Sequence, residues 1–160
     1  MNEDIDAIDL RLLEALQTDA SLSNQDLAAR VAVSPATCLR RVKRLVDAGV
    51  IERRVALLAA DKLGAGLQAL IEITLDRQGA EHLDAFEARA VQEAAVQQCW
   101  RVSPGPDFVL VVQVADMPAY QAFTQRLLTQ DANVRNIKAF FSVKRAKFDT
   151  RVMLPRRAPD

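Results

Sequence analysis

The stretch SPATCLRRVKRL, residues 34–45, is the most informative part of this sequence. Its first residue, Ser34, can cap the start of a helix with its hydroxyl group. Pro35 suits the first helical position because the N–H that proline lacks has no partner there. Apolar residues then recur with helical spacing up to Gly49, a residue type that commonly follows a helix. The stretch predicts a helix over residues 35–48.

This predicted helix has an apolar face and a basic face. We expect the inward face to comprise Cys38, Leu39, Val42, Leu45 and Val46. We expect the outward face to comprise Ala36, Thr37, Arg40, Arg41, Lys43 and Arg44. Arginine can contact guanine edges or phosphates through paired hydrogen bonds, and small residues near a helix N-terminus allow close approach to the major groove. Taken alone, such a basic face is better explained by a solvated surface, so its context decides.

Shorter helical segments precede the basic helix. The first carries apolar residues at helical spacing between Ile5 and Leu16. The second starts at Ser23, whose hydroxyl can accept from an early backbone N–H while Asp26 reaches back, and it ends near Ala32. Only two or three residues separate it from the basic helix. Helices joined by so tight a link predict a helix-turn-helix, a motif whose last helix enters the DNA major groove.

The distribution of charge supports this interpretation. The formal net charge is zero, which by itself argues against a nucleic-acid partner. Residues 1–29, however, carry seven acidic side chains and one basic one, whereas residues 30–54 carry seven arginines or lysines and two acidic residues. One basic surface is enough to attract a phosphate backbone. We therefore expect double-stranded DNA as a partner.

The second half of the chain alternates between strand-like and helix-like patterns. We expect strands over residues 67–75, 96–103 and 108–115, and a strand or a bent pair of strands over 134–147. We expect helices over 80–95 and 117–130. The order βαββαβ is that of a ferredoxin-like α+β sandwich. Such a sheet has one face covered by helices, and its other face needs a cover, which self-association commonly supplies.

The sequence therefore predicts two domains, an N-terminal all-α (winged) helix-turn-helix domain and a C-terminal α+β ferredoxin-like domain. Between them, the β-rich residues 50–58 predict a strand that acts as a wing or as a dimer arm, and the glycine-containing stretch 61–66 marks the boundary. We place the DNA-binding domain at 1–50, a linker strand and hinge at 51–66, and an effector-binding and oligomerisation domain at 67–160.

Other functional classes find little support. No apolar run approaches the roughly 20 residues that cross a bilayer, and the acidic start does not look like a secretory signal, so we expect a cytoplasmic protein without a membrane partner. Cys38 and Cys99 lie far apart in apolar surroundings, which favours buried thiols over a metal or redox site. With His82 as the only histidine, no base is available for a catalytic triad. We expect neither an enzyme nor a cofactor.

The chain resembles the Lrp/AsnC (leucine-responsive regulator/asparagine regulator) family of bacterial and archaeal transcription regulators over nearly its whole length. The most specific match is residues 34–45, and further matches are Gly49-Val50-Ile51, residues 5–9, Leu12-Leu13, Leu16-Gln17, Ser23-Asn24, Leu27-Ala28 and Val31. The resemblance implies a homodimer built partly through the linker strand and assembling to a tetramer or octamer. It also implies a sequence-specific regulator that responds to an amino acid or related small metabolite bound between C-terminal domains.

The resemblance places an effector loop between the second and third strands of the C-terminal domain. There Asp107 and Phe108 fit an expected Asp-aromatic pair, whereas Pro104 stands where a glycine is expected, with Gly105 one place later. Proline has no N–H to donate to a ligand carboxylate. In the last strand, apolar residues stand where the family often has threonine or another polar residue. Either the effector is less polar or differently shaped than a standard amino acid, or the site is vestigial.

Two sets of site residues follow from these arguments. The expected DNA-binding residues are Ser34, Pro35, Ala36, Thr37, Arg40, Arg41, Lys43 and Arg44. The expected effector-binding residues are Pro104, Gly105, Asp107, Phe108, Met117, Ile137, Ala139 and Phe140, with Asp107 as the main polar contact. The alternative for Asp107 is a turn residue that satisfies backbone donors. The alternative to pocket lining for Met117, Phe140 and Trp100 is packing in the core or at an interface.

Alternative functions stay open at this point. A global chromosome-organising DNA-binding protein with weak or no effector response would share the predicted fold, and it would differ in its ratio of specific to non-specific affinity. The siroheme decarboxylases are enzymes that resemble this family in both domains, but they need histidine and basic side chains around a tetrapyrrole. The lone His82 argues against that enzyme class.

Overall fold

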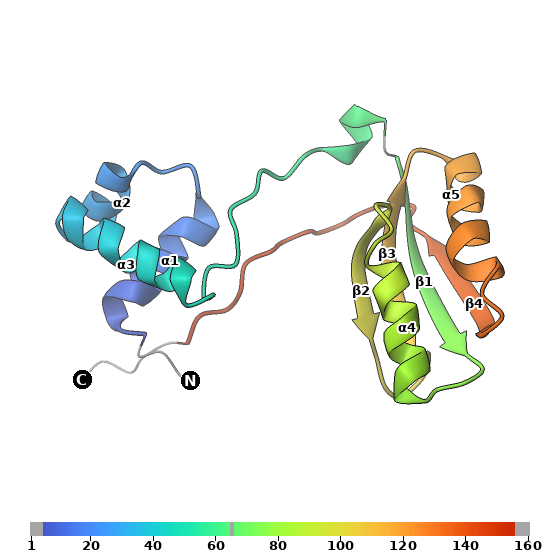
Figure 1. The fold of residues 1–160 in the computed structure, drawn as a ribbon. Coiled ribbons are helices and arrows are strands. Elements are labelled where there is room, and N and C mark those ends of the chain that lie inside the picture. Colours follow the sequence, from blue (N-terminus) through green and yellow to red (C-terminus); the bar gives the residue numbers. More distant parts are fainter. Residues whose placement is uncertain (1–4, 65, 156–160) are drawn as a thin grey trace. The chain divides into compact units, whose positions relative to one another are not determined.

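The computed structural model describes residues 5–64 and 66–155 of the chain. Within them, residues 5–57 and 147–155 form one compact unit, and residues 58–146 form another. Each unit has its own hydrophobic core. The chain therefore passes from the helical unit to the α+β unit and back again, as can be followed in Figure 1.

The helical unit contains, in its described part, α1 (Ala7–Thr18), α2 (Asn24–Val31) and α3 (Pro35–Asp47). Each helix starts at a polar cap, because the side chains of Asp6, Ser23 and Ser34 accept hydrogen bonds from backbone N–H groups of the first turn. At the end of α2, Ala32 adopts a left-handed conformation with φ of 57°, and α3 begins three residues later. The predicted helix-turn-helix is confirmed.

The three faces that meet between these helices form the core of the unit. It comprises Leu12, Ala15, Leu16, Leu27, Ala28, Val31 and Cys38. Leu45 is also fully buried. The inward orientation that we expected for Leu39 and Val46 is wrong, because 61% and 45% of these residues is exposed. Successive helical residues point about 100° apart, and the buried face is centred on Cys38 and Leu45, so each residue that directly follows one of these turns away from the core.

The linker also differs from expectation. Residues 52–59 have no regular secondary structure, and the short 3-10 helix η1 (Ala60–Leu63) follows them. A β-strand requires a neighbouring strand to complete its hydrogen bonds, and no described segment of this single chain supplies one. Val55, Leu57 and Leu58 are consequently exposed.

The C-terminal segment 147–155 belongs to the helical unit, whereas we expected the α+β domain to extend to residue 160. The side-chain amide of Gln17 pairs with the backbone of Val152 in both directions: its Nε2 donates to the carbonyl at 3.1 Å, and its Oε1 accepts from the N–H at 3.0 Å. Arg151 forms an ion pair with Glu14. These contacts with α1 explain why the segment leaves the sheet.

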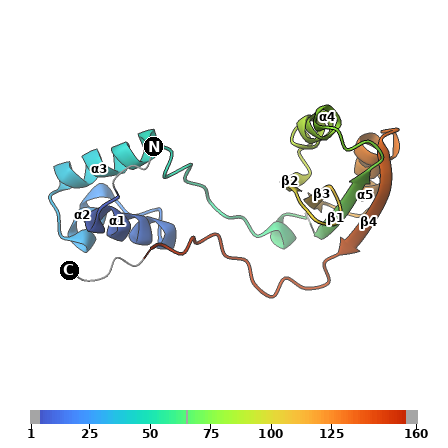
Figure 2. The ribbon, with the colours of Figure 1, turned by 90° about the horizontal axis from the view of Figure 1, so that it is seen from below.

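The α+β unit contains β1 (Leu67–Leu75), α4 (Ala80–Ala90), β2 (Val96–Arg101), β3 (Phe108–Val114), α5 (Met117–Thr124), the π-helix η2 (Gln125–Thr129) and β4 (Val134–Phe141). The described strands form an antiparallel sheet in the order β2-β3-β1-β4. Figures 1 and 2 show α4 and α5 against the sheet. The predicted ferredoxin-like order βαββαβ is confirmed, although α4, β2 and β4 end earlier than we expected.

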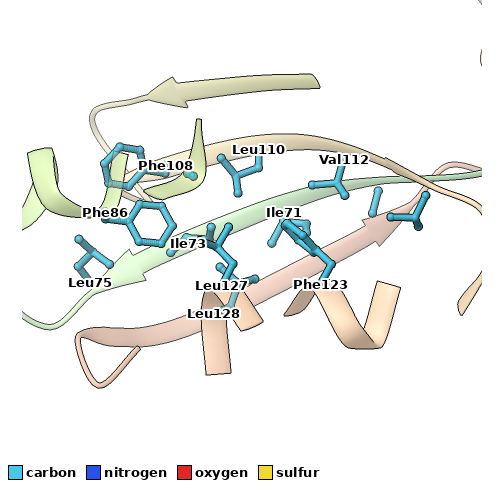
Figure 3. Packing of buried hydrophobic residues seen from close by; sticks show 13 residues of the cluster. Ile71, Ile73, Leu75, Phe86, Phe108, Leu110, Val112, Phe123, Leu127 and Leu128 are labelled. Carbon is cyan, nitrogen blue, oxygen red and sulfur yellow. The ribbon is translucent and has the colours of Figure 1, made fainter. Parts of the chain in front are cut away.

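One face of the sheet forms the core of this unit with the helices (Figure 3). Alternate residues of β1 and β3 are buried, among them Ile71, Ile73 and Leu110, and they pack against side chains of α4, α5 and η2. The rings of Phe86 on α4 and Phe108 on β3 lie 4.8 Å apart. The period-two burial confirms that these strands have one buried face.

The opposite face of the sheet carries apolar side chains without a cover in the described chain. Leu70 is 42% exposed, Trp100 57% and Phe140 53%. The strand register places Leu70 between Phe140 and Val111. Trp100 pairs with Val109 on the neighbouring strand. This open sheet face, defined by Leu70, Trp100, Val109, Val111 and Phe140, is where we expected self-association.

Candidate DNA interface and effector site

The N-terminal half of α3 presents the surface that we predicted to contact DNA. Ser34 and Pro35 are exposed at its start, and Ala36, Arg40 and Lys43 are exposed along its outer face. The Ser34 hydroxyl accepts from the Thr37 N–H at 3.2 Å and donates to the Thr37 hydroxyl at 2.9 Å. This end of α3 is thus capped and open to solvent.

Helix α2 holds the start of α3. The Asn24 side chain donates from Nδ2 to the Pro35 carbonyl at 2.9 Å. Because Asn24 is the first residue of α2, this hydrogen bond ties the N-terminal ends of the two helices together. The turn at Ala32 and this contact hold the start of α3 beside α2.

Arg41 and Arg44 point toward α1 instead of outward as we expected. Nη1 of Arg41 lies 2.6 Å from Oδ2 of Asp6 and 3.0 Å from Oδ1 of Asp9. Nη2 of Arg44 lies 2.5 Å from Oδ2 of Asp9, a carboxylate that is fully buried. The physical reason is electrostatic, since a buried carboxylate must be paired with positive charge.

The pKa values reflect this network. The backbone N–H of Asp9, and then the Arg41 guanidinium, lower the pKa of Asp6 to about 2. Hydrogen bonds to Asp6 and Asp9 raise the pKa of Arg41. Both groups therefore keep their charges at neutral pH. A shallow hollow of about 320 Å³ beside them is lined by Asp6, Arg40, Arg41 and Arg44.

The predicted effector loop connects β2 and β3. The peptide bond before Pro104 is cis, and Gly105 has φ of 122°, a conformation that favours glycine. Oδ2 of Asp107 accepts from the Leu75 N–H at 2.7 Å and from Nε2 of Gln78 at 3.2 Å. The carboxylate thus satisfies a backbone donor, the structural role that we had weighed as its alternative.

A pocket of about 400 Å³ lies next to this loop. It is lined by Gln78, Leu83, Arg101, Val102, Ser103 and Asp107. Of the predicted effector residues only Asp107 is among them, so our sequence reasoning missed the other five. The signal that could have found Arg101 is its position at the end of β2, directly before the predicted loop. Arg101 is paired with Asp84 at 2.7 Å and with Glu87 at 2.8 Å.

The remaining predicted effector residues lie in several places. Phe108 is fully buried in the core, where its ring packs against Phe86. Ile137 and Ala139 pack partly buried against the same core, whereas Phe140 lies on the open sheet face. Met117 is exposed at the start of α5, after β3, whereas Asp107 precedes β3. The two residues are therefore at opposite ends of that strand.

Other kinds of site are not found within residues 5–64 and 66–155. No group of three or more His, Cys, Asp and Glu side chains is arranged there to hold a metal ion. No helix in this part of the chain has the length and apolar character needed to span a membrane. Cys38 is buried, Cys99 is partly buried, and both are free thiols.

Comparisons with known proteins agree with both halves of the structure. The model of the Lrp/AsnC ligand binding domain matches residues 68–152, and a winged helix-turn-helix DNA-binding model matches residues 5–52. The leucine-responsive regulatory protein of Rhizobium meliloti is 37% identical over 144 residues, which cover 90% of this chain and 92% of that protein.

Solved structures show the same likeness. The crystal structure of an AsnC family transcriptional regulator from Agrobacterium tumefaciens has a TM-score of 0.85 and 31% identity, covering 92% of this chain and 95% of that one. A transcriptional regulator from Neisseria meningitidis in complex with L-Met has a TM-score of 0.84 and 32% identity, covering 91% and 94%.

Fold and site together define a transcription regulator with a DNA-binding helix-turn-helix domain and a separate ligand-binding domain. Its relatives are named as transcriptional regulators, not as enzymes, which favours this class over the decarboxylase alternative. The chain belongs to the Lrp/AsnC family.

Proposed function

We propose that the chain regulates transcription by inserting the N-terminal half of α3 into the DNA major groove. The observation that carries this proposal is the outer face of α3, where Ala36, Arg40 and Lys43 are exposed on successive turns of a capped helix. Arg40 is long enough to reach base edges, and the small Ala36 side chain permits close approach of the backbone. We accordingly propose double-stranded DNA as the partner and the cytoplasm as the location of the protein.

The variant Arg40→Ala tests this proposal. We expect it to weaken binding to a duplex that the wild-type protein selects from a random library by at least tenfold, measured across a salt titration. Arg77→Ala is the matched control, because Arg77 is also exposed but lies in the loop after β1. Equal binding by all three proteins across the titration would show that α3 does not contact DNA in this way.

We further propose that the α+β unit binds an amino acid or a related small metabolite. The L-Met complex of the Neisseria relative supports an amino acid as the class of effector. In this chain, the pocket beside the β2–β3 loop offers the carboxylate of Asp107 for an ammonium group. Because Asp107 and Met117 lie at opposite ends of β3, a site that uses both requires residues from two subunits.

A thermal-shift screen of amino acids tests effector binding. A ligand that binds the native state raises the melting temperature. We expect Asp107→Asn to lose the shift, since the amide still accepts from the Leu75 N–H but carries no charge. Glu81→Gln is the control, because Glu81 is an exposed acid outside the pocket. If Asp107→Asn keeps the full shift, the ligand binds elsewhere.

A chromosome-organising protein without an effector is the second candidate. It is favoured by the hydrogen bonds that already engage Asp107 and by the lack of an N–H at Pro104. This candidate predicts that no amino acid shifts the melting temperature. It also predicts similar affinities for the selected duplex and for a scrambled one.

We propose that the chain assembles as a homodimer and then as a tetramer or octamer. The support is the open sheet face and the exposed apolar linker residues Val55, Leu57 and Leu58. A second copy of the chain could cover the face and could also supply a strand to pair with the linker.

A further inference from the structure

At the start of α1, the carboxylates of Asp6 and Asp9 contact both the backbone of this helix start and side chains of α3. Oδ1 of Asp6 accepts from the backbone N–H groups of Ile8 and Asp9, both at 2.9 Å. In return, the Asp6 N–H donates to Oδ2 of Asp9 at 3.1 Å. This reciprocal cap fixes the two carboxylates relative to each other, and each has an oxygen directed at α3.

On the α3 side, the contacts divide between two arginines. Oδ2 of Asp6 and Oδ1 of Asp9 both contact Nη1 of Arg41, and Oδ2 of Asp9 contacts Nη2 of Arg44. The carboxylates carry two negative charges and the guanidinium groups two positive ones. We call these four residues the α1–α3 charge cluster.

Burial of part of this cluster restricts how its side chains can be arranged. Asp9 is fully buried, and the Nε atom of Arg41 is buried without a hydrogen-bond partner among the described residues. Breaking a buried pair by removing one partner leaves an uncompensated charge, which is far more costly than losing a surface ion pair. The cluster therefore resists rotation of α3 about its own axis.

The cluster also changes which cations α3 offers to DNA. The helix has four basic residues, Arg40, Arg41, Lys43 and Arg44. Those at 41 and 44 are directed at α1, while those at 40 and 43 remain on the exposed face. Cations that are free to reach phosphates increase affinity for every sequence alike. Holding two of them against carboxylates lowers this sequence-independent attraction.

We propose that Asp6 and Asp9 are positioning residues for sequence discrimination, because they hold Arg41 and Arg44 on α1 and so orient Arg40 and Lys43 toward the groove. This inference rests on the proposed binding of DNA by α3. It assigns a role in specificity to acidic residues that would repel DNA if they acted directly.

Asp9→Asn tests the inference because it removes the charge with little change of shape. We expect two effects in the full-length protein. The plot of log K against log salt should become steeper by about 0.9 for each arginine that turns to a phosphate. The preference for the selected duplex over a scrambled one should fall by about tenfold. Loss of fold alone would reduce binding to both duplexes without steepening the slope.

A rescue variant separates charge from packing. In Asp9→Asn combined with Arg44→Gln, the excess positive charge is gone, so we expect the salt slope and most of the preference to return. Asp6→Asn is a milder variant, since asparagine caps a helix as well as aspartate does. Circular dichroism will show whether Asp9→Asn is folded. If it is not, Asp6→Asn replaces it in the same two measurements. Glu14→Gln is the matched control, because Glu14 lies on α1 but pairs with Arg151.

The outcomes distinguish this inference from the proposed function. If Arg40→Ala abolishes discrimination while Asp9→Asn and Asp6→Asn both keep the wild-type slope and preference, the positioning role is wrong and DNA binding by α3 stands. If Arg40→Ala also has no effect, the proposed DNA interface itself is wrong.

Discussion

At the scale of single residues, Asp6 links local structure to electrostatics. Its side chain caps α1 and pairs with Arg41 at the same time. The ion pair requires the ionised carboxylate, and a protonated carboxyl also loses part of its capacity to accept hydrogen bonds. The low pKa of Asp6 therefore connects protonation to the stability of the helical unit.

This connection predicts an acid-dependent contribution to stability. The pKa of Asp6 is lowered from 3.8 to about 2, so its contribution is fully present above pH 3.8 and is lost as the pH falls toward 2. We expect wild-type protein to melt a few degrees above Asp6→Asn at pH 5. This difference should shrink as the pH falls toward 2 and vanish below it, as measured by scanning calorimetry. A difference that is constant over this range would contradict the assignment.

The thiols provide a second prediction at this scale. Burial raises the pKa of both Cys38 and Cys99, which lowers the fraction of reactive thiolate. Cys38 is fully buried and Cys99 only partly. Iodoacetamide at pH 8 should therefore modify Cys99 first and Cys38 much more slowly, with equal rates in urea. Mass spectrometry of the peptides measures both rates, and faster reaction of Cys38 would contradict its placement in the core.

Sequence patterns could predict where α3 begins, but not where its arginines point. The cap at Ser34 and the following proline are local signals, and the structure confirms them. The orientations of Arg41 and Arg44 depend on Asp9, more than thirty residues earlier in the chain. For the same reason, the hydrogen bond from the Leu75 N–H to Asp107 was not visible in the effector loop itself.

At the scale of elements, alternation of apolar residues was a sufficient signal for strands that pair within the chain. The bounds that we predicted for the first strand, 67–75, are those of β1, because its buried face must alternate with period two. The linker was different. Its β-rich composition predicted a strand over 50–58, but a strand also depends on a hydrogen-bonding neighbour, which a single sequence does not reveal.

The C-terminal segment yields a prediction at this scale. Its docking on α1 depends on the paired hydrogen bonds between Gln17 and Val152. In Gln17→Ala we expect trypsin to cleave after Arg151 several times faster than in wild-type protein, because the segment is released. Gln25→Ala is the control, as Gln25 is exposed on α2. Identical cleavage rates, followed by mass spectrometry, would show that these hydrogen bonds do not hold the segment.

At the scale of the whole molecule, the folding of one chain leaves apolar surface exposed. The core of the α+β unit lies on the helix-covered side of the sheet. On the open sheet face, Leu70 lies between Phe140 and Val111 in register, and Trp100, on the edge strand β2, lies beside Val109. Contiguous apolar patches are uncommon on monomeric proteins. The exposure of this face is therefore the observation that supports the proposed self-association.

The variant Leu70→Lys tests self-association through that face. Leu70 lies at its centre and is already 42% exposed in the single chain, so lysine should disturb the monomer little. Within an interface it would bury an unpaired charge, which costs far more than any contact it makes. We expect Leu70→Lys to sediment as a smaller species than wild-type protein in analytical ultracentrifugation.

Val91→Lys provides the control, because Val91 is a similarly exposed apolar residue that directly follows α4, away from the sheet strands. It should sediment as wild type. Trp100, the chain's single tryptophan, gives an independent signal on the open sheet face. Its emission should shift to longer wavelength in Leu70→Lys, since dissociation exposes the indole to water. If Leu70→Lys instead keeps both the sedimentation and the emission of wild-type protein, assembly uses another surface and this face stays open to solvent.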